Sequence, residues 1–175
     1  MNKKAWAVFS IGLFLGTFIF QGAAYSMSGT RMSDELEQIK KLEGTWQGTV
    51  VIEEKTEPAK IKYLVTSGGT AVVEILFPEM PNETVSVYYD NEDGLLAMQN
   101  FSELSVKPRM DLTSSSDKQI DFTLSSYNQF DVKQLHLHGL TMLFTNDGSL
   151  VRKASYYQGR SVHHDMVISA KKFIE

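Results

Sequence analysis

Two histidines two residues apart, His136 and His138, are the side chains best spaced to do chemistry together. On a β-strand, residues i and i+2 point to the same side, so both imidazole rings can line one surface. We expect that surface to be apolar and interior, because Leu140, Met142 and Phe144 share it. The pair could present two nitrogens to zinc, but a catalytic zinc needs a third protein ligand. The spacing does not require a third ligand, so we predict a ligand-lining pair and no metal site.

The adjacent histidines His163 and His164 are expected to act singly. Neighbours on a regular strand point to opposite faces, so the two rings cannot bind one metal together. His164 shares its parity with Val162 and Met166, so we predict that it faces inward and contacts a ligand. An inward histidine could also complete a zinc site or hold a haem iron. No pattern in the sequence requires either group, so we predict no cofactor.

Glu74 interrupts an apolar run from Ala71 to Phe77. The ordinary interpretation is a solvated carboxylate, because Ala71, Val73, Ile75 and Phe77 form the cleaner apolar set on the other face. The alternative is an inward carboxylate that contacts a ligand or acts as a general base. Glu74 is therefore a candidate ligand-binding residue. The sequence holds no cysteine and no Gly-x-Ser-x-Gly turn, so we predict no catalytic nucleophile.

The elements that would position these residues are mostly strands with alternating polarity. Residues 27–43 are predicted to form a leader and a short helix, with Asp34 as its cap and Leu36, Ile39 and Leu42 as its apolar stripe. From residue 44 to 175 the pattern has period two and is punctuated by turns rich in glycine, asparagine and serine. We predict strands near 45–55, 59–66, 70–77, 83–90, 94–101, 108–114, 119–126, 134–145, 149–157 and 161–173. Successive hairpins favour an all-β, antiparallel up-and-down barrel of about eight to ten strands.

Residues 1–26 have the order of a secretory signal peptide: a basic start, an apolar run and small residues before the expected cleavage site. An uncleaved anchor is the alternative, but an apolar run of about 16 residues is short for a membrane span. We therefore expect a periplasmic or secreted protein that keeps no membrane span. The net charge of −4 argues against nucleic acid as a partner. A small molecule is the expected partner, and the sequence does not indicate an oligomeric state.

The segment from Leu42 to Trp46 resembles the Gly-x-Trp start of the calycin superfamily, which includes the lipocalins. Longer segments are similar to a family of uncharacterised bacterial exported proteins of about this length: Thr66 to Pro78, Val87 to Tyr89, Lys107 to Met110 and Leu135 to Thr141. The resemblance implies a calycin-like barrel, and no established activity comes with it.

The chain departs from this family's pattern at polar positions. Tyr89 stands where the relatives tend to have a histidine, and Asn100-Phe101-Ser102 replaces a His-Tyr-Cys run. Tyr89 therefore becomes a candidate ligand-binding residue in place of that histidine. Arg109 has two interpretations: it could stack on Trp46 as a calycin arginine does, for which Arg152 competes, or bind a ligand carboxylate with its planar guanidinium.

Three functions remain open on these grounds. The first is a barrel that binds a small apolar or amphipathic molecule in its interior. The second is a hydrolase or lyase that uses His136, His138 and Glu74 as acid and base groups, which requires the three to converge. The third is an envelope interaction protein whose packed core has no cavity.

Overall fold

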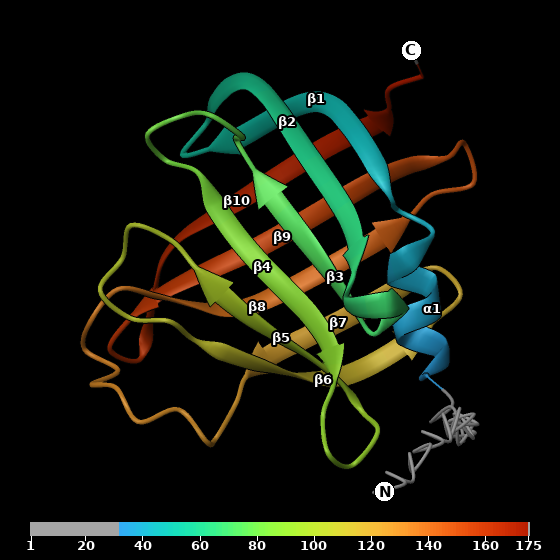
Figure 1. The fold of residues 1–175 in the computed structure, drawn as a ribbon. Coiled ribbons are helices and arrows are strands. Elements are labelled where there is room, and N and C mark those ends of the chain that lie inside the picture. The colour runs from blue at the N-terminus through green and yellow to red at the C-terminus, as the bar shows by residue number, and fades with distance from the viewer. Residues whose placement is uncertain (1–31, 175) are drawn as a thin grey trace, which may run out of the picture. The chain divides into compact units, whose positions relative to one another are not determined.

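Residues 32–174 form a closed barrel of ten antiparallel strands with one short helix, as the alternating sequence predicted (Figure 1). The computed structural model describes residues 32–174. The predicted signal peptide, residues 1–26, lies outside them. The elements are α1 (Asp34–Lys40), β1 (Gly44–Ile52), β2 (Lys55–Thr66), η1 (Ser67–Gly69), β3 (Ala71–Leu76), β4 (Thr84–Asp90), β5 (Leu96–Phe101), β6 (Arg109–Ser116), β7 (Gln119–Leu124), β8 (His136–Phe144), β9 (Ser149–Gln158) and β10 (Ser161–Lys172).

Each strand pairs with its neighbour in sequence, and β1 closes the barrel by pairing with β10. The seam runs from Trp46 opposite Lys172 to Ile52 opposite Met166. The two backbones approach closely at Gly48, where an added Cβ would lie 1.9 Å from the Ser169 carbonyl oxygen. Only glycine fits there without a backbone shift, so Gly48 allows β1 and β10 to pair at this close distance.

One side chain in two points inward from most strands and builds a single apolar core. On β1 the inward residues include Trp46 and Val50, and on β2 they include Ala59, Ile61 and Tyr63. The predicted parity is therefore correct for these two strands. It is wrong for β3, where Val72, Glu74 and Leu76 point inward instead of the odd-numbered set.

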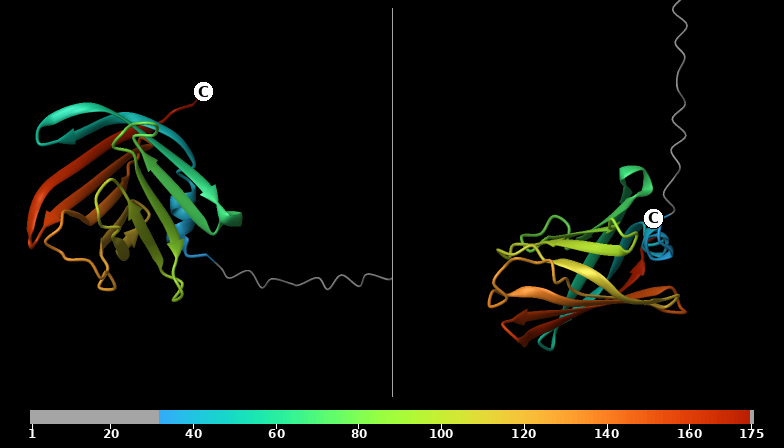
Figure 2. Two further views of the ribbon diagram at one scale, coloured as in Figure 1. Left: turned by 60° about the vertical axis from the view of Figure 1, so that its left-hand side comes forward. Right: turned by 90° about the horizontal axis from the view of Figure 1, so that it is seen from below.

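Helix α1 covers one end of the barrel (Figures 1 and 2). Its apolar stripe is buried as predicted, with Leu36 and Ile39 at 0% exposure and Leu42 at 3%. The helix cap is Ser33 and not Asp34: the Ser33 hydroxyl accepts from the Leu36 amide at 3.0 Å. The same hydroxyl donates to Asp90 on β4 at 2.6 Å, and Gln38 donates to backbone carbonyls of the β6–β7 turn. The helix thus spans this end from β4 to β7.

The opposite end carries the β1–β2, β3–β4, β5–β6, β7–β8 and β9–β10 connections (Figures 1 and 2). We call it the mouth. Among residues 32–174, no helix is long and apolar enough to cross a bilayer.

Candidate functional site

A buried charge cluster lies inside the barrel, centred on Glu74 of β3 and Arg152 of β9. Both side chains have 0% exposure. Arg152 Nε lies 3.2 Å from Glu74 Oε1 and 3.3 Å from Oε2, and its hydrogen-bond geometry favours Oε2. The hydroxyls of Tyr63 and Tyr88 also donate to Oε2, at 2.7 and 3.1 Å. The interpretation of Glu74 as a solvated carboxylate is wrong, because register sets it opposite Tyr63 and Ser86, which also point inward.

The cluster is electrically neutral as a whole. Burial, followed by the Glu74 charge, raises the pKa of Tyr63 and of Tyr88, so both phenols stay protonated and act as donors. Burial lowers the pKa of Arg152, but its interactions with Glu74 and the surrounding tyrosines together raise that pKa above its usual value. One positive guanidinium therefore faces one carboxylate, with neutral hydroxyls completing the set.

Three atoms of the pair have no hydrogen-bond partner: Glu74 Oε1 and both η nitrogens of Arg152. Buried polar groups in folded proteins are nearly always hydrogen-bonded, and each unmade bond costs about 1–3 kcal/mol. A guanidinium carries two N–H donors on each η nitrogen, so most of the donor capacity of Arg152 is unused. A polar group added beside this cluster could therefore form hydrogen bonds with the unpaired atoms of Glu74 and Arg152.

A pocket of about 180 Å³ opens at the mouth of the barrel, and we call it the mouth pocket. Tyr156 of β9 and His164 of β10 contribute to its wall, and their rings stack with centroids 4.7 Å apart and 11° between planes. The other lining residues come from strand ends and loops around the mouth, namely Ile52, Leu76, Phe77, Asn82, Thr84, Ser102, Glu103, Leu104, Leu135 and Met166. The lining therefore combines an apolar wall with a few hydroxyl, amide and imidazole groups, the composition typical of a small-molecule site.

His136 and His138 lie outside the core, contrary to the predicted inward orientation. A β-bulge between Leu137 and Gly139 shifts the register with β9, so Leu137 takes the inward position opposite Tyr156. His136 faces Tyr157, and His138 stacks on the Tyr157 ring with centroids 4.0 Å apart. The inserted residue reverses the parity that had grouped both histidines with Leu140.

Hydrogen bonds fix the arrangement of this outer pair. His136 is buried, and its Nδ1 lies 2.7 Å from the Gln134 carbonyl oxygen. Because a carbonyl only accepts, that nitrogen carries the proton and Nε2 is left as an acceptor. His138 Nδ1 lies 3.4 Å from this Nε2 and can donate to it. Burial, followed by the His136 charge, lowers the pKa of His138.

His163 and His164 are neighbours in space as well as in sequence, so the prediction of opposite faces is wrong. A second bulge, between Val162 and His164, brings the two Nδ1 atoms to 2.8 Å. It also leaves Val162 52% exposed, whereas Met166 is buried. Burial, then the His163 charge, lowers the pKa of His164. Across residues 32–174, no three His, Cys, Asp or Glu side chains form a group that could hold a metal ion.

Arg109 and Tyr89 lie together on the outer face of the barrel. Both line a surface depression of about 450 Å³ with Tyr127 and the acidic β4–β5 turn. The Arg109 guanidinium pairs with Asp111 at 3.1 Å and lies over the Tyr127 ring, 5.2 Å from its centroid. Arg109 follows the outward parity next to buried Met110, so it does not stack on the inward Trp46.

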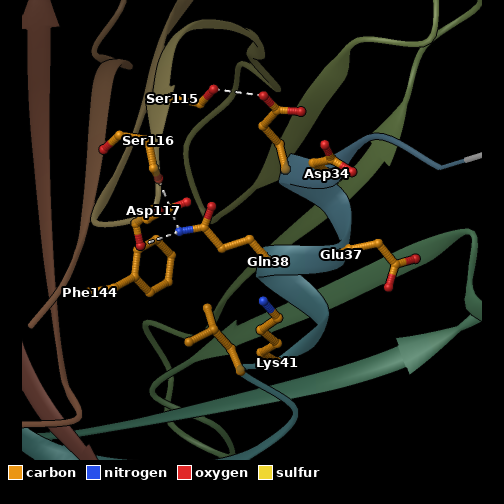
Figure 3. Close-up of a pocket in the computed structure, with 10 residues that line it drawn as sticks. Asp34, Glu37, Gln38, Lys41, Ser115, Ser116, Asp117 and Phe144 are labelled. Atoms are coloured by element: carbon orange, nitrogen blue, oxygen red, sulfur yellow. Dashed lines mark hydrogen bonds between the residues drawn. The ribbon is translucent and has the colours of Figure 1, made fainter. Parts of the chain in front are cut away.

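A further depression of about 590 Å³ lies between α1 and the β6–β7 turn (Figure 3). Its wall combines polar side chains with Leu42 and Phe144. Ser115 donates to Glu35, and Gln38 donates to the carbonyls of Ser116 and Asp117. These bonds attach the helix to the barrel end. The depression is therefore the seam between helix and turn.

The structure thus brings His164 to the mouth pocket and Glu74 to the buried cluster, and it separates both from His136, His138, Arg109 and Tyr89. The hydrolase or lyase hypothesis required Glu74 to meet His136 and His138. That convergence does not occur, since the carboxylate faces the core and the histidine pair lies on the other side of the sheet.

Sequence reasoning named Arg152 only as a competitor of Arg109 and did not single out Tyr156. A signal was present: Leu150, Arg152, Ala154 and Tyr156 share one parity, and an arginine in such a set points to an inward charge.

Comparison with models of protein families and with curated protein sequences finds no match. Among solved structures, the chain is similar to a candidate outer membrane protein of Bacteroides fragilis, with 9% identity and a TM-score of 0.19. That likeness covers 77% of this chain and 99% of the other. At this TM-score it supports no inference about function.

Proposed function

We propose that this protein is an exported calycin-like barrel that binds a small, largely apolar molecule at its mouth. The observation that carries the proposal is the mouth pocket itself. Apolar side chains from β1, β3, β10 and the loops converge there around Tyr156 and His164. The sequence patterns of the signal peptide and the calycin resemblance support the compartment and the fold family.

The size of the pocket limits what it can hold. Ligand sites for drug-sized molecules usually enclose about 300–1,000 Å³, whereas the mouth pocket has about 180 Å³. The core below it is filled by side chains such as Tyr63, Tyr88 and Met98, all at 0% exposure. The expected guest is therefore a short chain or a single ring.

Toluene, a neutral single-ring probe of the expected size, tests the proposal by isothermal titration calorimetry. The pocket-lining residues Leu104 and Leu135 are half-buried, so L104Q and L135Q should leave the core intact. Each removes apolar contact worth about 1–2 kcal/mol, so probe affinity should fall roughly 5- to 30-fold. The matched control is L95Q, since Leu95 is 57% exposed on the β4–β5 turn, away from the mouth.

Saturable binding to the wild type, weakened by L104Q and L135Q but not by L95Q, supports the mouth as the site. The proposal fails if the wild type shows no saturable binding, or if L95Q weakens binding as much as the two mouth variants. In that case the packed core favours an interaction protein without a cavity.

A further inference from the structure

The buried cluster presents an unused set of hydrogen-bonding atoms of both kinds. The η nitrogens of Arg152 can only donate, and Glu74 Oε1 can only accept. The Glu74 and Arg152 charges cancel, and both tyrosine hydroxyls are already engaged with Oε2. A group that fills this set must accept from the guanidinium, donate to the carboxylate and bring no net charge.

Tyr156 links this cluster to the mouth pocket. It lines the pocket and lies on the same inward face of β9 as Arg152, with only the small side chain of Ala154 between them. The two groups are close enough to interact, since the Arg152 charge opposes the rise that burial causes in the Tyr156 pKa. Tyr156 therefore belongs both to the wall of the mouth pocket and to the surroundings of Arg152.

We propose that the ligand of the mouth pocket carries an uncharged head group that both donates and accepts hydrogen bonds, a primary amide or an alcohol, which binds Arg152 and Glu74. This inference rests on the proposed function, because the apolar part of the same molecule occupies the mouth. It adds the chemical class: a neutral amphiphile with one amide or hydroxyl end.

Charge excludes the more obvious anionic head. A carboxylate could accept from both η nitrogens, but Glu74 already neutralises the guanidinium at 3.2 Å. A second carboxylate would leave one uncompensated negative charge in the core, and burying such a charge costs several kcal/mol. A neutral amide instead fills the unused donors and the unused acceptor at once.

Entry of the head group requires Tyr156 to move. The unpaired atoms of Glu74 and Arg152 have almost no accessible surface in this conformation. Tyr156 packs against the core and stacks on His164, whose ring is only partly buried. Rotation of the Tyr156 ring must break this stack, which is worth about 0.5–1.5 kcal/mol, and give up part of the core contacts.

A matched ligand series tests the head group while the apolar tail stays constant. Octanamide, octanol and octanoate are titrated into the protein by isothermal titration calorimetry at pH 8, where octanoate is ionised. Pairing the free donors and acceptor is worth about 1–3 kcal/mol, so octanamide should bind roughly 5- to 150-fold more tightly than octanoate. Tighter binding of octanoate would overturn the inference.

Two variants assign the preference to the cluster. E74Q removes the carboxylate charge and leaves Arg152 unpaired. This variant should therefore bind octanoate more tightly than octanamide. Octanoate should also raise the melting temperature of E74Q more than that of the wild type. E74Q/R152M removes both charges and should bind octanamide and octanoate with similar affinity. An unchanged preference for octanamide in the double variant would refute the role of the cluster. If no ligand of the series and no probe binds the wild type, the proposed function itself fails.

Discussion

The ion pair between Glu74 and Arg152 gives the sharpest stability prediction, because both side chains are wholly buried. Removing one partner of a buried pair leaves an unpaired charge and costs about 3–5 kcal/mol. Small domains are stable by only about 5–15 kcal/mol in total. R152M and E74Q should therefore each lose a large share of the free energy of unfolding, with melting temperatures lower by roughly 6–20 °C.

The two single variants should differ in stability. E74Q leaves a buried guanidinium, which cannot release its proton in the accessible pH range, so it should be the less stable of the two.

The double variant E74Q/R152M completes the cycle. It holds no buried charge, and the new amide carbonyl on β3 still accepts from Tyr63 and Tyr88, so its stability should lie within about 2 kcal/mol of the wild type. Urea unfolding followed by circular dichroism should then give a coupling free energy of at least about 4 kcal/mol. Additive losses, or single-variant losses below about 1 kcal/mol, would refute the claim that the pair is buried and tightly coupled.

Two further changes test other parts of the structure. Gly48→Ala should lower the free energy of unfolding by about 1–3 kcal/mol, because its Cβ would collide with the Ser169 carbonyl. Gly139→Ala is the matched control, since the atoms nearest to its Cβ lie 4.0 Å away. Similar urea midpoints for the two variants would contradict the close approach of β1 and β10. The folded state holds the pKa of His138 below its usual value, so folding favours the neutral imidazole. The stability that this preference contributes is fully present above about pH 6.5 and is lost as the pH falls below that value. His138→Gln should therefore show a smaller drop in melting temperature between pH 7.5 and 5.0, and an unchanged drop would contradict that direction.

The number, order and pairing of the strands could be predicted from the sequence, because alternation of period two is a local property. Half-buried strands such as Gly44–Ile52 and Gln119–Leu124 show it directly, and the glycine-rich and asparagine-rich turns between strands mark the hairpins. The apolar stripe of the helix was equally local. The cap was misplaced by one residue because Ser33 and Asp34 are both good caps, and only the contact to Asp90 distinguishes them.

The candidate site could be predicted only in part, since its geometry depends on two bulges and one buried charge. The bulge beside Gly139 shifts the register by one residue, so parity counted along Leu135 to Phe144 without it assigns the histidines to the wrong side. Glu74 was ambiguous for another reason. A carboxylate is interior only if its counter-charge is, and Arg152 lies far away in sequence on β9. Pairing of that kind is a property of the folded barrel.

The β1–β10 seam also sets the order in which the barrel can be completed. All other strand pairs join neighbours in sequence, so each can form as a local hairpin. Closure must wait until residues 166–172 meet residues 46–52, which is a contact between the two ends of the domain. Such late, non-local pairing slows folding. Until it forms, β1 and β10 each present an open edge that can pair with another chain. A truncation within β10 should therefore appear first as aggregation during refolding, before any loss of the remaining hairpins.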